Sequence, residues 1–369
     1  MIVYLAGARW DAVAGTDRHL AEAIGRHEPV LWVDPPMSWI GRRRRGVVAH
    51  RLGTVAPGVT RLHTIGPPGV TRFGIRSVAR LLVRRQVRRV LRETGERPRA
   101  VVLSSPEPLL PGWRGTTRIY YATDDFIAGA GLLGFSRRYA ERVQAANLAA
   151  ADHVLAVSQT LVEELGRDGR PVELMPNGCR PEAYLPTPAS PRPFEVDLPG
   201  PVAGLVGQLN ERLDLGLLEA VADEGHSLLL VGPRYEQDAG TRRRLDALVA
   251  RSTVRWVGRQ PVERLPEFLA AMDVGLTPYT DTAFNLASFP LKTLEYLAAG
   301  LPVVSTDLPS ARWLATEHID LASDPDKFAA LVRTRLGERR TPELVASRRA
   351  VVGRHSWDAR AEQFLRLVP

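Results

Sequence analysis

The chain has 369 residues, of which 44% are hydrophobic and 24% charged, and its formal net charge is +8. This composition excludes an intrinsically disordered chain, a collagen-like repeat and a small disulfide-framed fold, and the length suits about two to three domains. The single cysteine, Cys179, cannot form an intrachain disulfide, which suits a reducing compartment. No apolar run approaches the roughly 18 residues of a membrane span, and the apolar start lacks the basic segment of a signal peptide. We therefore expect a cytoplasmic protein, at most peripheral to a membrane.

Arginine carries nearly all of the positive charge. Lys292 and Lys327 are the only lysines, so 49 basic residues minus 2 leaves 47 arginines. Such a bias is typical of a GC-rich genome acting on solvated positions. Net charge alone therefore identifies no partner, because it reports on association and solubility rather than on fold.

The first half of the chain alternates short apolar segments with longer helical patterns, at 134–151 and 159–168. The apolar segments are continuous rather than alternating, as expected of strands covered on both faces. They are residues 1–6, 30–33, 100–103, 118–121 and 153–157. This order predicts a parallel, doubly wound sheet.

A proline-rich segment, 185–201, has no helical period and is predicted to be a linker. A second series of strands follows it, at 202–206, 227–231, 254–257, 274–277 and 302–305. We expect two Rossmann-like domains, 1–190 and 200–355, with the helix at 356–369 packing back on the first. A cleft between the carboxyl ends of the two sheets would then bind the ligand.

The most informative segment runs from Ser288 to Val304. Pro290 and Gly300 delimit a short helix that precedes a buried strand. The free N–H groups at its amino end form a candidate anion site. Lys292 stands in its first turn, where a helix dipole disfavours a cation, which indicates a phosphate ligand. Glu295, one turn deeper, can accept hydrogen bonds from vicinal hydroxyls such as those of a ribose.

This segment resembles the donor-binding signature of GT-B glycosyltransferases, specifically of the retaining glycosyltransferase family four. The resemblance covers most of the chain and is to a bacterial subgroup that includes teichuronic-acid-type transferases. The other matching motifs are YYATDDF (120–126), MPNG (175–178), GQLNERLD (207–214), VGP (231–233), WVGR (256–259) and SWDAR (356–360). The resemblance implies a GT-B fold of class α/β, in which the first domain binds the acceptor and the second binds a nucleotide sugar.

The resemblance implies a donor site in the second domain. Glu295 would hold the ribose, while Arg212 and Lys292 would neutralise the diphosphate. The implied donor-binding residues are Gly207, Arg212, Trp256, Gly258, Phe289, Leu291, Lys292 and Glu295. Fixed positive charge would stabilise the diphosphate leaving group, so no metal ion is expected. No cofactor is expected beyond the nucleotide-sugar co-substrate, for which a UDP-sugar is favoured.

The first domain would supply the acceptor side of the site. The implied residues are Gly7, Arg9, Trp10, Asp11, Gly15 and His19. Asp124 or Asp125 would stand near the transferred hexose and complete, with Arg212 and Lys292, the predicted catalytic set.

The sequence departs from the family pattern at three places. Many members carry a glutamate eight positions before Glu295, where this chain has Ala287, so the identity of the sugar stays open. Gln208 replaces a common arginine, and Leu213-Asp214 replaces the usual Lys-Gly. Diphosphate binding would therefore depend heavily on Arg212 and Lys292.

Simpler interpretations of these residues stay open. Arg212 can pair with Asp214 or Glu211, and Asp124-Asp125 can cap the following segment as an Asx turn. Glu295 and Lys292 can be solvated residues of an amphipathic helix. His19 can belong to the first helix without facing a cleft.

Arginines recur at every fourth residue within 72–92, at positions 76, 80, 84, 88 and 92. On a helix they form a basic stripe beside an apolar one of Val83, Val87, Val90 and Leu91. One interpretation is a surface helix that packs by its apolar face. The other is a docking element for anionic lipid or for an acidic carrier protein, and the arginines at 42–45 (RRRR) would reinforce such docking. No nucleic-acid partner is expected, since no aromatic platform accompanies the arginines.

We thus expect transfer of a hexosyl group, such as N-acetylglucosamine or another hexose, from a nucleoside diphosphate sugar to a hydroxyl or amine. The transfer would be retaining and metal-independent, in polysaccharide or natural-product biosynthesis, with a small, lipid-linked or carrier-bound acceptor. The alternatives are a nucleotide-sugar epimerase on the same fold and a non-catalytic basic docking module. Donor base, acceptor and oligomeric state stay open.

Overall fold

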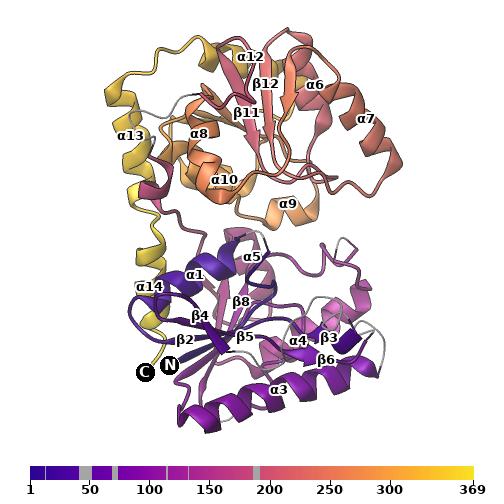
Figure 1. The fold of residues 1–369 in the computed structure, drawn as a ribbon, viewed down its shortest axis with the longest axis vertical. Coiled ribbons are helices and arrows are strands. Elements are labelled where there is room, and N and C mark those ends of the chain that lie inside the picture. Colours follow the sequence, from indigo (N-terminus) through magenta and orange to yellow (C-terminus); the bar gives the residue numbers. More distant parts are fainter. Residues whose placement is uncertain (13, 41–51, 69–73, 114, 132, 186–191) are drawn as a thin grey trace. The chain divides into compact units, whose positions relative to one another are not determined.

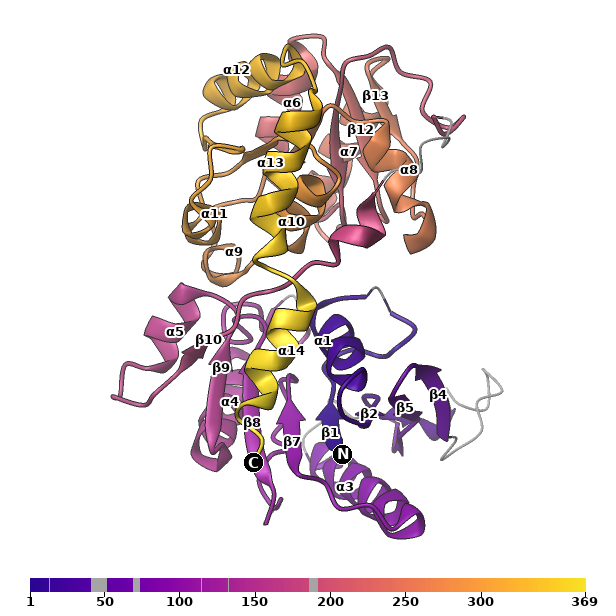
Figure 2. The ribbon, with the colours of Figure 1, turned by 90° about the vertical axis from the view of Figure 1, so that its left-hand side faces the viewer.

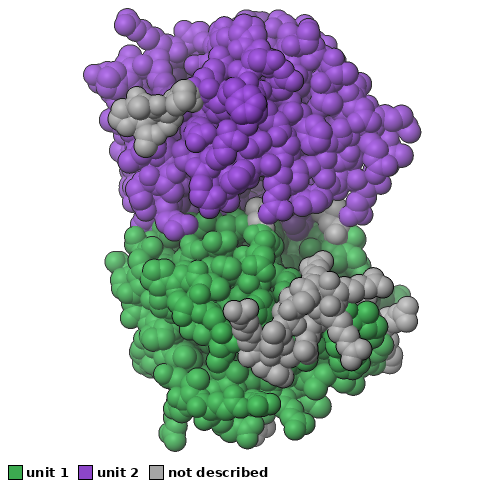
Figure 3. Space-filling view, viewed as in Figure 1, with its two compact units in different colours: residues 1–176, 357–369 green, residues 177–356 purple. Residues whose placement is uncertain are grey.

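The computed structural model describes residues 1–369 except 13, 41–51, 69–73, 114, 132 and 186–191. Its contacts divide the chain into two compact units (Figure 3). Unit 1 comprises Met1–Pro176 and Trp357–Pro369, and unit 2 comprises Asn177–Ser356. The division precedes the boundary at residue 190 that the linker suggested, because Asn177 and Tyr184 already bond to residues of unit 2.

Unit 1 is built on an eight-stranded sheet of order β10-β9-β8-β7-β1-β2-β5-β4 (Figure 1). All neighbours are parallel except β4 and β5, which are antiparallel. Its strands are β1 (Ile2–Leu5), β2 (Val30–Val33), β4 (Leu52–Ala56), β5 (Val59–Leu62), β7 (Ala100–Leu103), β8 (Thr117–Ala122), β9 (His153–Ala156) and β10 (Glu173–Leu174). A two-stranded sheet adds β3 (Met37–Ser38) and β6 (Ile65–Gly66). The strands predicted in this half are confirmed, whereas the antiparallel β4 was not expected.

Five described helices complete unit 1: α1 (Thr16–Gly25), α3 (Ile75–Thr94), α4 (Arg137–Ala150), α5 (Gln159–Leu165) and α14 (Trp357–Leu365). Ser136 and Ser158 begin α4 and α5 by accepting backbone N–H bonds, which satisfies donors that the helix itself leaves free. The last helix, α14, packs on α1, as Figure 2 shows. The rings of His19 and Trp357 are stacked there at 5.6 Å. Among the described residues, no helix is long and apolar enough to cross a bilayer.

Unit 2 contains a six-stranded parallel sheet of order β13-β12-β11-β14-β15-β16. Its strands are β11 (Val202–Val206), β12 (Ser227–Val231), β13 (Val254–Trp256), β14 (Val274–Thr277), β15 (Val303–Ser305) and β16 (Ile319–Leu321). The five strands predicted in this half are confirmed, and β16 was not predicted. The strand order reverses between β11 and β14, where open sheets of this kind bind ligands. The predicted α/β class with two doubly wound sheets is thus confirmed.

The helices of unit 2 cover both faces of its sheet (Figure 1). They are α6 (Leu215–Asp223), α7 (Ala239–Val249), α8 (Leu265–Ala270), α9 (Ala283–Ala287), α10 (Leu291–Ala298), α11 (Pro309–Leu314), α12 (Pro325–Leu336) and α13 (Pro342–Gly353). Of two 3₁₀ turns, η1 (Pro181–Tyr184) precedes these helices, and η2 (Val262–Arg264) lies between α7 and α8. Five of these helices have an N-cap residue whose side chain accepts a hydrogen bond from a backbone N–H of the first turn. These residues are Asp214, Asp238, Thr282, Asp324 and Thr341.

Tyr296 fixes α10 on the sheet. Its ring is fully buried, and its hydroxyl accepts a 2.7 Å bond from the backbone N–H of Val206, where β11 ends. The ring fills the space above Gly275 in β14, where a Cβ would lie only 2.3 Å from it. Glycine at this position therefore lets α10 approach the point where the strand order reverses.

We expect Gly275→Ala to lower the free energy of unfolding by about 1–3 kcal/mol, because the methyl group collides with a ring that cannot move freely. Chemical denaturation of the purified variants measures this change. Gly353→Ala is the matched control, because a Cβ there meets nothing within 4 Å. Equal stabilities of the two variants would contradict this account of the packing.

Candidate functional site

The amino end of α10 has no side-chain cap from the residue that precedes it. Pro290 precedes the helix with an extended backbone and provides no side-chain cap. The turn before it is fixed by Phe289, which is buried and whose carbonyl accepts a 2.7 Å bond from Asn177 Nδ2. Pro290 therefore does not cap the N–H groups of the first helical turn, which include that of the predicted residue Leu291. An anion can accept hydrogen bonds from these groups.

Lys292 and Glu295 project from the first two turns of α10 and contact each other. The distance from Lys292 Nζ to Glu295 Oε2 is 2.5 Å, and the two side chains are 24% and 7% exposed. The two residues predicted to bind phosphate and ribose are thus neighbours, and each neutralises the other in the free protein. A phosphate can take over the ammonium group, and ribose hydroxyls can donate to the carboxylate.

Tyr184, which the sequence analysis missed, lies against the same carboxylate. It ends the turn η1, is buried, and its hydroxyl is hydrogen-bonded to Glu295. Burial, and then the charge of Glu295, raise the pKa of Tyr184 far above its ordinary value, so the hydroxyl stays protonated and donates. Cys179 is buried nearby, and burial raises the pKa of its thiol as well. The only signal in the sequence was Pro181, which starts a helical turn close to the matching MPNG motif.

Arg212 follows β11 and is held by neutral groups. Its Nε donates to Asn285 Oδ1 at 2.9 Å, and its Nη2 lies 3.4 Å from Ser288 Oγ. The guanidinium also lies over the rings of Phe284 and Tyr279, at 4.8 and 5.4 Å. Among the described residues no carboxylate forms a salt bridge with it, so its charge remains available to an anion beside α10.

The simpler interpretation of Arg212, an ion pair with Asp214 or Glu211, is wrong. Asp214 caps α6 by accepting from the N–H of Gly216 at 2.9 Å. Glu211 accepts instead from two backbone N–H groups, one of them that of Asp238 at 2.7 Å. Both carboxylates are thus committed to local structure.

Ala287 ends α9 at the position where many family members carry a carboxylate. Its side chain is buried, with 1% exposed. The methyl group provides no hydrogen-bonding atom, so any polar contact to a sugar at this point has to come from another residue.

Backbone segments at the ends of three strands meet close to β11. The N–H of Gly207 donates to Val231 O, and the N–H of Gly232 donates to Gly258 O. A Cβ at Gly232, whose φ is +147°, would lie 1.8 Å from Gly207 O, so only glycine allows this approach. Trp256, 37% exposed, donates from Nε1 to Gly232 O at 2.8 Å. The fold thus brings Gly207, predicted for the phosphate cradle, close to Trp256 and Gly258, predicted to border the base.

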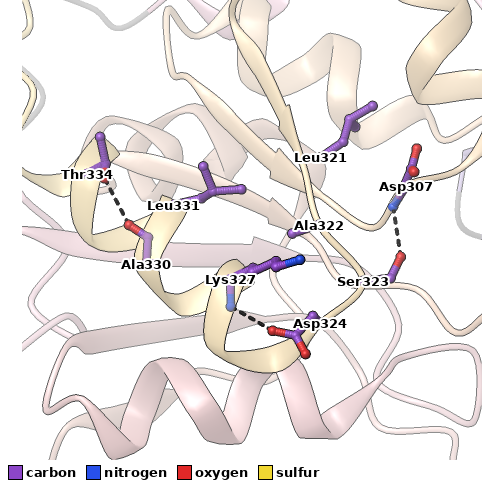
Figure 4. Close-up of a pocket in the computed structure, with 9 residues that line it drawn as sticks. All are labelled: Asp307, Leu321, Ala322, Ser323, Asp324, Lys327, Ala330, Leu331 and Thr334. Atoms are coloured by element: carbon purple, nitrogen blue, oxygen red, sulfur yellow. Dashed lines mark hydrogen bonds between the residues drawn. The ribbon is translucent and has the colours of Figure 1, made fainter.

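A separate hollow in unit 2 contains none of these residues (Figure 4). Its volume is about 510 Å³, and it lies between the end of β16 and α12. Its lining comprises Asp307, Leu321, Ala322, Ser323, Asp324, Lys327, Ala330, Leu331 and Thr334. Lys327, the other lysine of the chain, therefore belongs to a different part of unit 2 from Lys292.

In unit 1, the predicted acceptor residues after β1 surround Asp34, a buried carboxylate that the sequence analysis missed. Its carboxylate contacts Trp10 N, Trp32 Nε1, Arg61 Nε, His63 Nδ1 and Arg9 Nη2 at 3.1, 3.0, 2.9, 3.1 and 3.8 Å. The outer side of Arg61 forms two bonds with Asp11, of 2.7 and 2.6 Å, and these bonds lower the pKa of Asp11. Arg9, Trp10 and Asp11 thus form one charged network at the carboxyl edge of the sheet.

Asp17, in the first turn of α1, is a second residue that the sequence analysis missed. It accepts a 3.0 Å bond from the N–H of Gly7, where β1 has just ended. Burial raises the pKa of Asp17 to about 6, and the bond from Gly7 only partly offsets this effect. Its place between β1 and β7, where the strand order of unit 1 reverses, adds a titratable carboxyl to the acceptor side.

The remaining predicted residues of unit 1 lie apart from this network. Gly15 precedes α1, and its carbonyl accepts from the N–H of His19, whose ring stacks on Trp357. Asp125 caps its own loop, since its Oδ1 accepts at 2.9 Å from the N–H groups of both Ile127 and Ala128. This is the Asx-turn alternative, and it commits one oxygen of Asp125 to its own loop. Among the described residues, no group of three or more His, Cys, Asp or Glu side chains could hold a metal ion.

Comparisons with known proteins agree with this geometry. Residues 200–337 match the family model of glycosyl transferases group 1. The "Putative teichuronic acid biosynthesis glycosyltransferase TuaH" of Bacillus subtilis (strain 168) is 26% identical over 276 residues, 70% of this chain and 68% of that protein. The fold is similar to that of sucrose-phosphate synthase from Thermosynechococcus elongatus, with a TM-score of 0.78 at 18% identity, over 99% of this chain and 97% of the other. The protein is a glycosyltransferase of the GT-B fold.

A second solved structure places this glycosyltransferase in the same fold. Anabaena Alr3699/HepE, in complex with UDP-glucose, has a TM-score of 0.71 and is 15% identical, over 99% of this chain and 98% of the other. At such identity the likeness shows the fold alone, so the residues that bind a substrate in this chain have to be argued from its own geometry.

We expect Tyr184→Phe to weaken the binding of uridine diphosphate about threefold to tenfold, because Glu295 loses a hydrogen bond that orients it. Isothermal titration calorimetry measures the dissociation constant. Tyr139→Phe is the matched control, since it removes an equivalent 2.9 Å bond from a tyrosine to Glu107 in unit 1. Unchanged affinity in Tyr184→Phe would remove Tyr184 from the site.

We expect the stability of Asp17→Asn relative to the wild type to depend on pH. Between the ordinary pKa of 3.8 and about 6, the folded chain holds a proton that the unfolded chain has lost. Asp17 therefore favours the folded state below about pH 4 and loses this contribution as the pH rises through about 6. The free energy of unfolding of the variant, relative to that of the wild type, should therefore rise by about 1–3 kcal/mol between about pH 3.5 and about pH 7.5. Urea unfolding at each pH measures this difference. A difference that is constant with pH would contradict this assignment.

Proposed function

We propose that this glycosyltransferase moves a hexosyl group from a nucleoside diphosphate sugar, with a UDP-sugar favoured, to a hydroxyl or amine acceptor. One observation carries the proposal: Arg212 Nη2 lies 3.4 Å from Ser288 Oγ, beside the amino end of α10. Three groups lie around this contact in unit 2: a guanidinium that has no salt bridge among the described residues, the ammonium of Lys292, which a phosphate can take over from Glu295, and a helix end that Pro290 does not cap. Together they provide the fixed positive potential that a diphosphate needs. Glu295 would accept hydrogen bonds from the ribose, and Trp256 would border the base.

In the proposed reaction the bond between the anomeric carbon and the diphosphate oxygen breaks, and a bond to the acceptor oxygen or nitrogen forms. The proton of the acceptor passes to the departing diphosphate. Arg212, Lys292 and the backbone N–H groups of α10 stabilise the negative charge that develops there. The transfer would retain the anomeric configuration and require no metal ion, as the resemblance to family four implies.

Unit 1 would bind the acceptor through the loop that follows β1. Arg9, Trp10 and Asp11 are held there by Asp34 and Arg61, so their positions are set before the acceptor arrives. Asp124 or Asp125 would contact the transferred hexose. The acceptor would be a polysaccharide intermediate, a lipid-linked sugar or a natural-product scaffold, and TuaH favours the first of these. We place the protein in the cytoplasm, which the single cysteine suits.

A nucleotide-sugar epimerase would use the same donor residues without an acceptor. Incubation of the enzyme with a labelled nucleotide sugar alone distinguishes the two functions. We expect no epimerised product in the absence of acceptor, because the proposed reaction needs the acceptor to form the new bond.

We expect Lys292→Ala to lower turnover at saturating donor at least tenfold, about 1.4 kcal/mol, because a cation beside the departing diphosphate is lost. Lys327→Ala is the matched control, since it removes the only other lysine, which lies in the separate hollow of Figure 4. Initial rates with a panel of nucleotide sugars measure both effects. Full turnover in Lys292→Ala would rule out stabilisation of the leaving group by this residue.

A further inference from the structure

The long helix α3 has one face in the core of unit 1 and one face in solvent. The buried face comprises Ala79, Val83, Gln86, Val87, Val90 and Leu91. This confirms the apolar stripe predicted from the sequence. The exposed face lies opposite on the helical wheel and comprises Val78, Leu81, Arg85, Arg89 and Arg92. We name these five residues the outer stripe of α3.

The outer stripe differs from the basic stripe that the sequence predicted at every fourth residue. Three of the predicted arginines bind unit 1 itself. Arg76 lies 3.7 Å from the centre of the Tyr139 ring, Arg84 donates to Pro108 O at 3.1 Å, and Arg88 donates to Gly112 O at 2.8 Å. Of the four exposed arginines of α3, Arg88 and Arg92 belong to the predicted set, whereas Arg85 and Arg89 do not. The predicted basic residues Arg42–Arg45 lie outside the described residues.

Large apolar side chains are exposed on α3 and next to it. Leu81 is 67% exposed and Val78 is 51% exposed, on the first half of the outer stripe. Trp39 and Ile40, 47% and 51% exposed, directly follow β3, which pairs with β6. Strand β6 is held on α3 by Gln86, which bonds to both backbone groups of Ile65. Val78 and Leu81 are thus the exposed apolar part of the outer stripe itself and mark an interaction surface, whereas Trp39 and Ile40 follow a sheet that contacts α3 through its buried residue Gln86.

The charge of this helix is strongly positive. The helix α3 contains seven arginines and a single carboxylate residue, Glu93. Glu93 forms a 2.6 Å ion pair with Arg89. Arg85 on the outer stripe has no ion pair among the described residues. Beyond the helix lies a hollow of about 970 Å³, whose lining includes Arg97 and Arg366 together with two paired arginines. Arg118 pairs there with Asp152, and Arg99 pairs with Glu28. The ring of Trp113 links the two regions, since it lines the hollow and lies 5.7 Å from the guanidinium of Arg88.

We infer that the outer stripe of α3 docks unit 1 on an anionic phospholipid bilayer. The arginines match the charge of the headgroups, and the apolar side chains of Val78 and Leu81 are of the types that enter the interface between headgroups and acyl chains. An acidic protein would satisfy the arginines but would not require the half-exposed apolar side chains. A bilayer satisfies both features at once. Docking would hold the acceptor-binding unit at the surface on which a lipid-linked acceptor resides.

Vesicle flotation with the full chain tests this inference. We expect the wild type to bind vesicles of phosphatidylcholine with about one-third phosphatidylglycerol, and to bind pure phosphatidylcholine vesicles at least tenfold more weakly. Arg85→Glu combined with Arg92→Glu should lower binding to the anionic vesicles at least tenfold, and high salt should do the same because it screens the attraction. Leu81→Gln should lower binding several-fold.

Matched variants separate docking from net charge and from general hydrophobicity. Arg243→Glu combined with Arg339→Glu makes the same change of charge on exposed positions of unit 2, and Phe194→Gln removes a side chain that is 89% exposed there. Both should bind anionic vesicles like the wild type. Absence of wild-type binding, or equal losses in the unit 2 variants, would overturn the inference; the first result would favour an acidic protein. Calorimetry with uridine diphosphate tests the proposed function separately, because the residues of the outer stripe lie outside the donor site.

Discussion

The proposed donor site depends on the packing of Tyr296 over Gly275. The ring occupies the space that a side chain on β14 would fill, and its hydroxyl reaches the backbone of Val206 where β11 ends. These two contacts fix α10 at the point where the strand order reverses. Because Lys292 and Glu295 precede Tyr296 on the same helix, their positions follow from these two contacts between helix and sheet.

The charges of the donor site are held in two different ways. Arg212 is oriented by an amide, a hydroxyl and two aromatic rings, so its charge is not cancelled by its supports. Lys292 is instead paired with Glu295. A ligand that offers both a phosphate and vicinal hydroxyls can replace this ion pair with two charge-assisted hydrogen bonds, whereas a ligand with only one of these groups leaves a charge without a partner. The pair can thus contribute to selectivity for nucleotides.

The proposed site takes buried carboxylates from unit 1 and cations from unit 2. Asp34 and Asp17 are both close to the carboxyl end of β1, and they act on the acceptor loop through Trp10 and Gly7. Asp34 is compensated by Arg61, whereas Asp17 is compensated mainly by a backbone N–H, which is why burial raises its pKa. The two units therefore divide the proposed chemistry, with a fixed positive site for the leaving group in one and hydrogen-bonding carboxylates in the other.

The sequence by itself determined the two parallel sheets, the buried face of α3 and the helix that carries Lys292 and Glu295, because continuous apolar strands and helix-end signals are local. It did not reveal Tyr184, Asp34 or Asp17, since each of these residues acquires its role from a partner far away in the chain. Nor did it show which arginines of α3 face solvent, because a period of four residues drifts around a helix of 3.6 residues per turn. Tertiary structure decided those points, since burial and hydrogen bonding depend on what packs against a residue rather than on its neighbours in sequence.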